Sequence, residues 1–159
     1  MRHLPKHLRP RWRYLAVGLE SWPDASLSRG AFQRELWYAA QNLVGDTKSA
    51  DADLTVLGFD FERGRGETLV RARRDEVSVA RAVVACVDEV DGHPLGVRVR
   101  GVSGTVRAAE ERYLNRGPGR FEERTVVVDE DARTAVARPP VVDVAGPGGF
   151  SGATELDFE

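Results

Sequence analysis

Apolar residues in the first two thirds of this chain change their spacing from segment to segment, and this pattern limits the folds that the chain can adopt. Some segments repeat at every second position, as on one face of a strand, and others at three or four positions, as on one face of a helix. The predicted strands are 14–20, 54–61, 67–74 and 95–101. The predicted helices are 28–44, 75–91 and 101–115. This βαββαβ order, with one further helix, predicts an α+β fold in which two helices back an antiparallel sheet.

Capping residues set the predicted limits of the first two helices. Ser26 or Ser28 can accept hydrogen bonds from backbone N–H groups at the start of the first helix, and Gly45 can end it. Asp75 is the predicted N-cap of the second helix. The Asp-Gly pair at 91–92 is the predicted end of that helix, because these two residues favour turns.

The region after residue 116 lacks this clear pattern. Residues 117–138 contain one possible further strand, at 125–128. Residues 139–159 are acidic, poor in apolar periodicity and interrupted by Gly-Pro-Gly-Gly at 146–149, so we predict a disordered acidic tail. A single α/β domain at 14–116 with extensions on both sides fits the length of 159 residues.

The formal net charge of −2 conceals an uneven distribution of charge. Residues 1–13 form a basic arm without acids, and Pro5 and Pro10 predict that this arm is extended. The predicted tail carries four acids and no base, so the rest of the chain has a formal charge of +2. A basic arm can follow the phosphate backbone of a nucleic acid. Its candidate RNA-binding cations are Lys6, Arg9, Arg11 and Arg13.

A second group of cations belongs to the predicted sheet. Arginines alternate with apolar residues in the third and fourth predicted strands, so their side chains should share the sheet face that points away from the first two helices. These arginines are Arg71, Arg73, Arg98 and Arg100. Four guanidinium groups would suit phosphate oxygens. The alternative is that they form ion pairs with acids of the third helix or the tail.

The composition offers little support for other kinds of site. The third predicted strand has no aromatic residue, which favours recognition of RNA shape and backbone over stacking of bases. The single Cys86 cannot form an intramolecular disulfide, and no apolar run approaches the roughly 20 residues of a membrane span. We therefore expect a cytoplasmic protein. No His and Cys residues have metal-ligand spacing, so we predict no catalytic residue, no metal site and no bound cofactor.

Three motifs resemble one protein family. The segment from His3 to Leu15, the segment from Gly101 to Ala109 and the Val-Arg-Ala-Arg sequence at 70–73 are similar to archaeal ribonuclease P protein component 2. This family is the archaeal counterpart of the eukaryotic POP-five subunit. The resemblance covers roughly residues 3–114, and the extension after about residue 117 departs from the family pattern.

The resemblance implies a ferredoxin-like or RRM-like sandwich and a role in removing the 5′ leader of precursor tRNA. It implies that RNA supplies the active site with magnesium ions, while the chain is a non-catalytic subunit. Its partners would be ribonuclease P RNA, precursor tRNA and ribonuclease P protein component 3. The third helix adds Arg107 to the candidate RNA-binding residues.

Other functions with the same element order stay open. A generic module for structured RNA would explain the arginines, and a small-molecule-binding regulatory domain would explain the fold but not the basic arm. An acylphosphatase-like enzyme needs a glycine-rich phosphate loop after the first strand. The sequence has Glu-Ser-Trp-Pro at 20–23 in that place.

Overall fold

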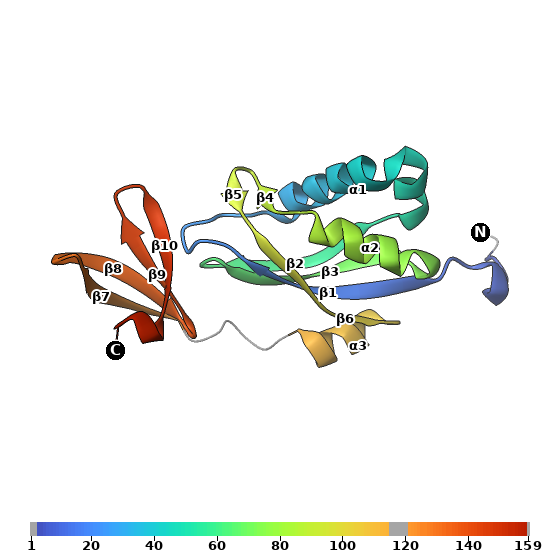
Figure 1. Ribbon diagram of the computed structural model, residues 1–159. Coiled ribbons are helices and arrows are strands. Elements are labelled where there is room, and N and C mark those ends of the chain that lie inside the picture. The colour runs from blue at the N-terminus through green and yellow to red at the C-terminus, as the bar shows by residue number, and fades with distance from the viewer. Residues whose placement is uncertain (1–2, 115–120, 159) are drawn as a thin grey trace.

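The computed structural model describes residues 3–114 and 121–158, and its core is a four-stranded antiparallel sheet (Figure 1). The strand order is β2-β3-β1-β6, and every neighbouring pair in it is antiparallel. The core strands are β1 (Trp12–Glu20), β2 (Thr55–Glu62), β3 (Arg65–Arg73) and β6 (Gly96–Ser103). The helices are α1 (Arg29–Ala52), α2 (Val77–Ala85) and α3 (Val106–Tyr113). The predicted α+β class with an antiparallel sheet is confirmed.

Strand β1 shows how alternation builds both faces of this sheet. Leu15 and Val17 are fully buried among residues of α1 and α2, which cover one face. Ala16 points to the other face, where it packs with Leu69 of β3 and Ala109 of α3. Helix α3 therefore packs on β1 and β6, on the face that α1 and α2 leave open (Figure 1).

Helix α1 begins where the sequence indicates but extends further than predicted. The Ser28 hydroxyl accepts a hydrogen bond from the backbone N–H of Ala31 at 3.1 Å, as an N-cap does. Gly45, with φ 78° and ψ 172°, interrupts the helix, and the chain then resumes a helical course to Ala52. Asp53 ends it in the left-handed conformation with φ 47°.

Helix α2 is shorter than predicted. Asp75 lies in a 3₁₀ turn, η2 (Arg74–Glu76), so it is not the N-cap of α2. The Asp-Gly pair at 91–92 does not end the helix but forms the tip of a small hairpin between β4 (Glu89–Val90) and β5 (His93–Pro94). Both residues have positive φ, as the favoured two-residue hairpin turns require.

The acidic tail is folded rather than disordered, and that prediction was wrong for residues 139–158. The described residues after 120 form a second antiparallel sheet with the order β10-β9-β8-β7. Its elements are β7 (Glu122–Val128), β8 (Asp131–Arg138), β9 (Val141–Gly146), β10 (Gly149–Thr154) and the 3₁₀ turn η3 (Glu155–Phe158). The possible strand at 125–128 is thus part of β7. The predicted domain boundary between residues 116 and 117 lies outside the described residues.

Small apolar residues explain why this sheet forms despite its weak sequence pattern. Val126, Ala135, Ala137, Val142 and Val144 form its buried cluster, and each side chain is small, so each strand buries little area alone. The Gly-Pro-Gly-Gly segment that indicated disorder contains the turn between β9 and β10. The buried residues of the cluster come from β7, β8 and β9, and the partly buried Ala153 of β10 packs against them, so the cluster forms only when the strands assemble.

Arg138, at the end of β8, attaches the second sheet to the core. Its guanidinium is 3% exposed and forms a buried ion pair with Asp143 of β9. The same group donates hydrogen bonds to the carbonyl oxygens of Ser21 at 3.0 Å and Arg63 at 3.3 Å. In return, Arg65 donates to the carbonyl oxygen of Arg138 at 2.7 Å. The second sheet thus lies at the end of the core opposite the N-terminal arm (Figure 1).

Candidate nucleic-acid interface

The N-terminal arm, residues 3–11 of the described chain, is exposed and is not fully extended. A 3₁₀ turn, η1 (Lys6–Leu8), separates its two prolines, and the Leu8 N–H donates to the Pro5 carbonyl oxygen at 2.9 Å. The Arg9 side chain donates to the Leu4 carbonyl oxygen at 2.8 Å. A single turn needs only local hydrogen bonds, which the proline positions do not block. The arm presents its cations, Lys6, Arg9 and Arg11, to solvent.

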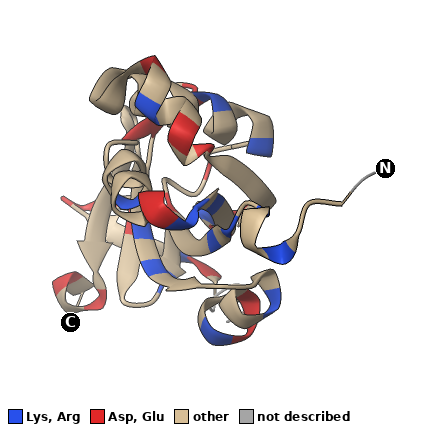
Figure 2. Ribbon diagram, turned by 90° about the vertical axis from the view of Figure 1, so that its right-hand side faces the viewer, with Lys and Arg blue, Asp and Glu red and all other residues tan. Residues whose placement is uncertain are grey.

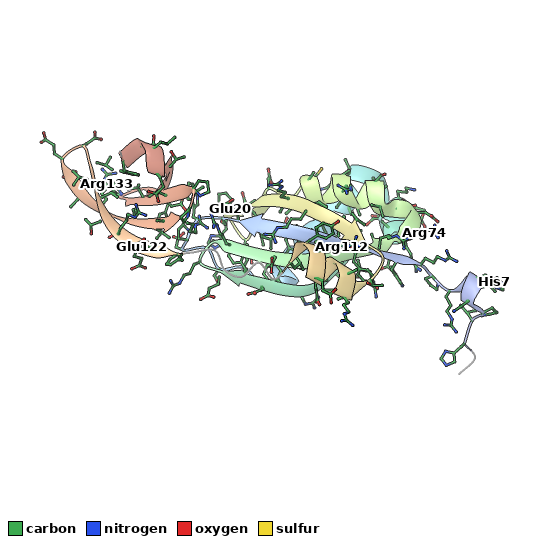
Figure 3. All side chains as sticks on the ribbon, turned by 90° about the horizontal axis from the view of Figure 1, so that it is seen from below. His7, Glu20, Arg74, Arg112, Glu122 and Arg133 are labelled. Atoms are coloured by element: carbon green, nitrogen blue, oxygen red, sulfur yellow. The ribbon has the colours of Figure 1, made fainter. Side chains whose placement is uncertain are left out.

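Backbone contacts fix the base of the arm to the end of the core sheet. The Arg74 N–H donates to the Arg11 carbonyl oxygen at 2.9 Å, which joins the arm to the residue after β3. The Arg13 guanidinium donates to the carbonyl oxygen of Trp12 at 2.9 Å. Figure 3 places Arg74 between the core and His7 of the arm. Arg74 therefore belongs to the same basic region, although the sequence pattern did not single it out.

Two of the four predicted sheet arginines lie together beside this base. Trp12 pairs with Arg73 in the register of β1 and β3, and Arg71 lies two residues further along β3 on the same face. Both guanidiniums lie over the Trp12 ring, with Cζ 4.0 Å from its centroid for Arg71 and 4.2 Å for Arg73. The Arg73 guanidinium is also 3.6 Å from the carboxylate of Asp53.

Arg100 has a structural role, but its acidic partner lies in β3 and not in the third helix or the tail, where the alternative interpretation placed it. Its guanidinium forms an ion pair with Glu67 at 2.6 Å and donates to the carbonyl oxygen of Tyr113 at 3.1 Å. The first contact joins β6 to β3, and the second joins β6 to α3. Arg100 therefore ties three elements together.

Arg98 is exposed and lies apart from the arginines at the arm. It pairs with Gly18 of β1, six residues along the strand from Trp12, which corresponds to about 20 Å. Among residues 3–114 and 121–158, no hydrogen bond or ion pair to Arg98 is found. The sheet arginines share a face but do not form a single cluster, because α3 packs on β1 and β6 between them.

Arg107 lies in the first turns of α3 and is open to solvent. It forms an ion pair with Glu111, one helical turn further on, at 2.8 Å, and the two side chains are 88% and 64% exposed. Such an exposed pair contributes little to stability, so the guanidinium can exchange Glu111 for a phosphate. Arg112 lies on the same helix and is labelled in Figure 3.

Cations of the arm and of the end of β3 lie together at the arm end of the core. Figure 2 looks directly at this end and shows cationic segments in the arm and at the nearby strand ends, whereas α3 carries both signs of charge. One nearby acid, Glu76, already accepts a hydrogen bond from Lys48 at 2.8 Å. This hydrogen bond raises the pKa of the Lys48 ammonium above its usual value.

The described part of the chain offers neither a metal-binding group of side chains nor a membrane-spanning helix. In residues 3–114 and 121–158, no group of three or more His, Cys, Asp or Glu side chains could hold a metal ion. Within the same ranges, no helix has both the length and the apolar character to cross a membrane.

The region that contains the core sheet and its helices matches a known family. The model of the Rpp14/Pop5 family matches residues 13–114. The chain belongs to the Rpp14/Pop5 family. The Rpp14/Pop5 region ends directly after α3, so the second sheet lies outside it. Most of the arm also precedes this region.

Relatives of this Rpp14/Pop5 chain are found among archaea. It is 65% identical over 159 residues to "Ribonuclease P protein component 2" of Natronomonas pharaonis, covering 99% of this chain and 98% of that protein. The protein of the same name from Halorubrum lacusprofundi is 58% identical over 159 residues and 100% of both chains. The Methanosarcina mazei protein is 37% identical over 114 residues, which are 72% of this chain and 93% of that protein.

A solved structure with some likeness to this chain is the cryo-EM structure of yeast ribonuclease MRP. One of its chains has 15% sequence identity and a TM-score of 0.49, and the match covers 63% of this chain and 79% of that chain.

Proposed function

We propose that this chain is a protein subunit of ribonuclease P, the ribonucleoprotein that removes the 5′ leader from precursor tRNA. The observation that carries the proposal is membership of the Rpp14/Pop5 family, together with relatives named ribonuclease P protein component 2 that match along its length. The chain acts in this assembly as a non-catalytic subunit. The sheet order β2-β3-β1-β6 supports a ferredoxin-like arrangement for its core.

The basic end of the core supports a role in binding RNA. Its cations come from the arm, from the base of the arm and from the end of β3. In order along the chain they are Lys6, Arg9, Arg11, Arg13, Arg71, Arg73 and Arg74. Cations that neutralise phosphates release counterions and lower the repulsion between RNA segments. The folded RNA then needs fewer magnesium ions to hold its active site closed.

This proposal assigns the chemistry and its magnesium ions to the RNA. The other partners are precursor tRNA and ribonuclease P protein component 3, and the assembly works in the cytoplasm. Arg100 is not part of the proposed RNA surface, because Glu67 and the carbonyl oxygen of Tyr113 already occupy its guanidinium. Arg98 and Arg107 remain candidates for contacts away from the arm.

Neutralising the arm tests the proposal. In a variant that combines Lys6→Gln, Arg9→Gln and Arg11→Gln, we expect precursor-tRNA cleavage at low magnesium to fall about tenfold, because three cations no longer neutralise RNA phosphates. Raising the magnesium concentration should restore most of the rate, since divalent ions replace the missing charge. The measurement is the cleavage rate across a magnesium titration, with ribonuclease P RNA and component 3 present.

A matched control removes three charges elsewhere. Arg34 and Arg81 lie on the helices of the opposite face and Arg133 lies in the second sheet, so their replacement by Gln should leave the magnesium titration unchanged. Equal losses in both variants would point to total charge rather than to the arm. If the unmodified chain binds unrelated structured RNA as tightly as ribonuclease P RNA, a general RNA-binding module is the better description.

A further inference from the structure

Trp12 lies where the arm meets the core, and two arginines of β3 stack on it. In the antiparallel register, Trp12 is directly opposite Arg73, and Arg71 lies on the same face one pleat away. Their guanidinium carbons are 4.2 Å and 4.0 Å from the ring centroid. All three side chains are half-buried. The indole therefore holds two cations in one place.

A stacked guanidinium keeps its hydrogen-bonding edge free. The attraction to an aromatic ring uses the flat face of the guanidinium, whereas its five N–H donors lie in the plane of the group. These in-plane donors match the oxygens of a phosphate, which guanidinium can bind with two parallel hydrogen bonds. Stacking on Trp12 thus orients Arg71 and Arg73 without occupying their donors.

Arg71 and Arg73 have few polar partners among the described residues. The Arg71 Nε atom is covered by the protein and has no hydrogen-bond acceptor within the described ranges, so the donors that this partly exposed side chain can offer to a phosphate are its terminal nitrogens. Arg73 is 3.6 Å from Asp53, and both side chains are partly exposed, so this ion pair is weak. Beside them, Arg11 and Arg74, whose backbones are joined by a hydrogen bond, carry further positive charge.

We propose that Trp12, Arg71 and Arg73 form a clamp for the phosphodiester backbone of RNA, in which Trp12 is the positioning residue. This clamp rests on the proposed RNA-binding function and gives it a defined site at the junction of the arm and the sheet. The ligand group is a backbone phosphate, so the clamp recognises the position of a strand and not the identity of its bases.

The test compares RNA affinity and its salt dependence for Trp12→Leu and Trp12→Phe in the full-length chain with ribonuclease P RNA. Neither variant changes the net charge. We expect Trp12→Leu to bind roughly tenfold more weakly, because both guanidiniums lose their support. The magnitude of the salt slope should fall by about 0.7–0.9 for each phosphate that the variant no longer neutralises. Trp12→Phe retains an aromatic ring and should lie between Trp12→Leu and the unmodified chain.

A double-mutant comparison separates positioning from general destabilisation. If Trp12 acts through the arginines, Trp12→Leu should cause no further loss of affinity in a chain that already carries Arg71→Ala and Arg73→Ala. Thermal unfolding of every variant shows whether the fold is intact. Trp37→Leu is the matched control, because Trp37 lies in α1 on the other side of the sheet and its replacement should leave the salt slope unchanged.

The outcomes distinguish the clamp from the proposed function. An unchanged salt slope in Trp12→Leu, while Arg71→Ala and Arg73→Ala weaken binding, would overturn the positioning role of Trp12. Full RNA affinity in the double arginine variant would overturn the clamp and leave RNA binding to other residues. Failure of the unmodified chain to bind ribonuclease P RNA would overturn both the clamp and the proposed function.

Discussion

Arginine is the main cation of this chain, and its side chains occur in distinct environments. Arg138 is buried and ion-paired with Asp143. Arg100 joins strands and a helix through Glu67 and a backbone carbonyl. Arg71 and Arg73 stack on an indole and keep donors available. A guanidinium supports all of these roles because its flat face and its polar edge act independently.

At the residue scale, we predict that Asp53→Asn strengthens RNA binding. Asp53 is the acid next to Arg73, and its removal frees that guanidinium for phosphate. The gain should be about two- to fivefold, as the loss of an exposed ion pair is worth up to about 1 kcal/mol. Asn tolerates the left-handed conformation of this position well, so the end of α1 should be preserved.

Filter binding with ribonuclease P RNA checks this prediction. Asp51→Asn is the matched control, because it removes the same charge from the last turn of α1, two residues away and without an ion pair to Arg73 in the described chain. Identical gains in the two variants would mean that net charge, rather than release of Arg73, controls the affinity.

At the scale of elements, the second sheet depends on its four strands acting together. Arg124 of β7 forms hydrogen bonds at 3.0 Å to both carboxylate oxygens of Glu155 in η3, which connects the first strand of the sheet to the turn after its last strand. Trp22 of the core stacks on Phe150 of β10 with ring centroids 6.3 Å apart. The first strand of the second sheet is thus linked to the turn after the last strand, and β10 contacts the core.

We therefore predict that deletion of residues 139–159 destabilises the rest of the second sheet. The deletion removes β9 and β10, exposes the apolar residues of β8 and leaves the buried Arg138 without Asp143. Residues 121–138 should become sensitive to proteases and lose hydrogen-exchange protection. Unchanged protection of β7 and β8 after the deletion would show that this hairpin folds independently.

At the scale of the whole molecule, the basic arm and the attachment of the second sheet lie at opposite ends of the core. The basic arm extends from one end of the core, and the second sheet is attached to the other end through Arg138 (Figure 1). Gly64 permits this attachment: a side chain there would lie 2.6 Å from both the Arg138 guanidinium and the carbonyl oxygen of Ser21. Docking and RNA binding should thus be separable by mutation.

We predict that Arg138→Met lowers the free energy of unfolding by about 3–5 kcal/mol, because it leaves Asp143 buried without a partner. The double variant Arg138→Met with Asp143→Leu should recover a large part of this loss, since no buried charge remains. Chemical denaturation measures both effects. RNA affinity of the folded single variant should stay within about twofold of the unmodified chain, because the site is far from the arm. Equal stability of the single and double variants would contradict the buried-charge explanation.

The core strands and the start of α1 could be predicted from the sequence alone. Alternation of Leu15, Val17 and Leu19 specifies a strand in which these three side chains share one buried face, and Ser28 provides a side-chain oxygen at the position where a helix needs one. These signals are local, so residues close together in the sequence are sufficient to specify the strand and the start of the helix. The resemblance to ribonuclease P protein component 2 also came from short sequence motifs, and the family match confirms it.

The second sheet and the roles of individual arginines depended on tertiary structure. The apolar side chains that the strands after residue 120 bury are all small, so no single segment has a strong pattern, and the sheet is stable only when its strands pack together. The partners that separate structural from available arginines lie far apart in sequence: Glu67 for Arg100, and Ser21 for Arg138. Sequence periodicity gives the face on which a side chain lies, but only the folded chain brings its partner within hydrogen-bonding distance.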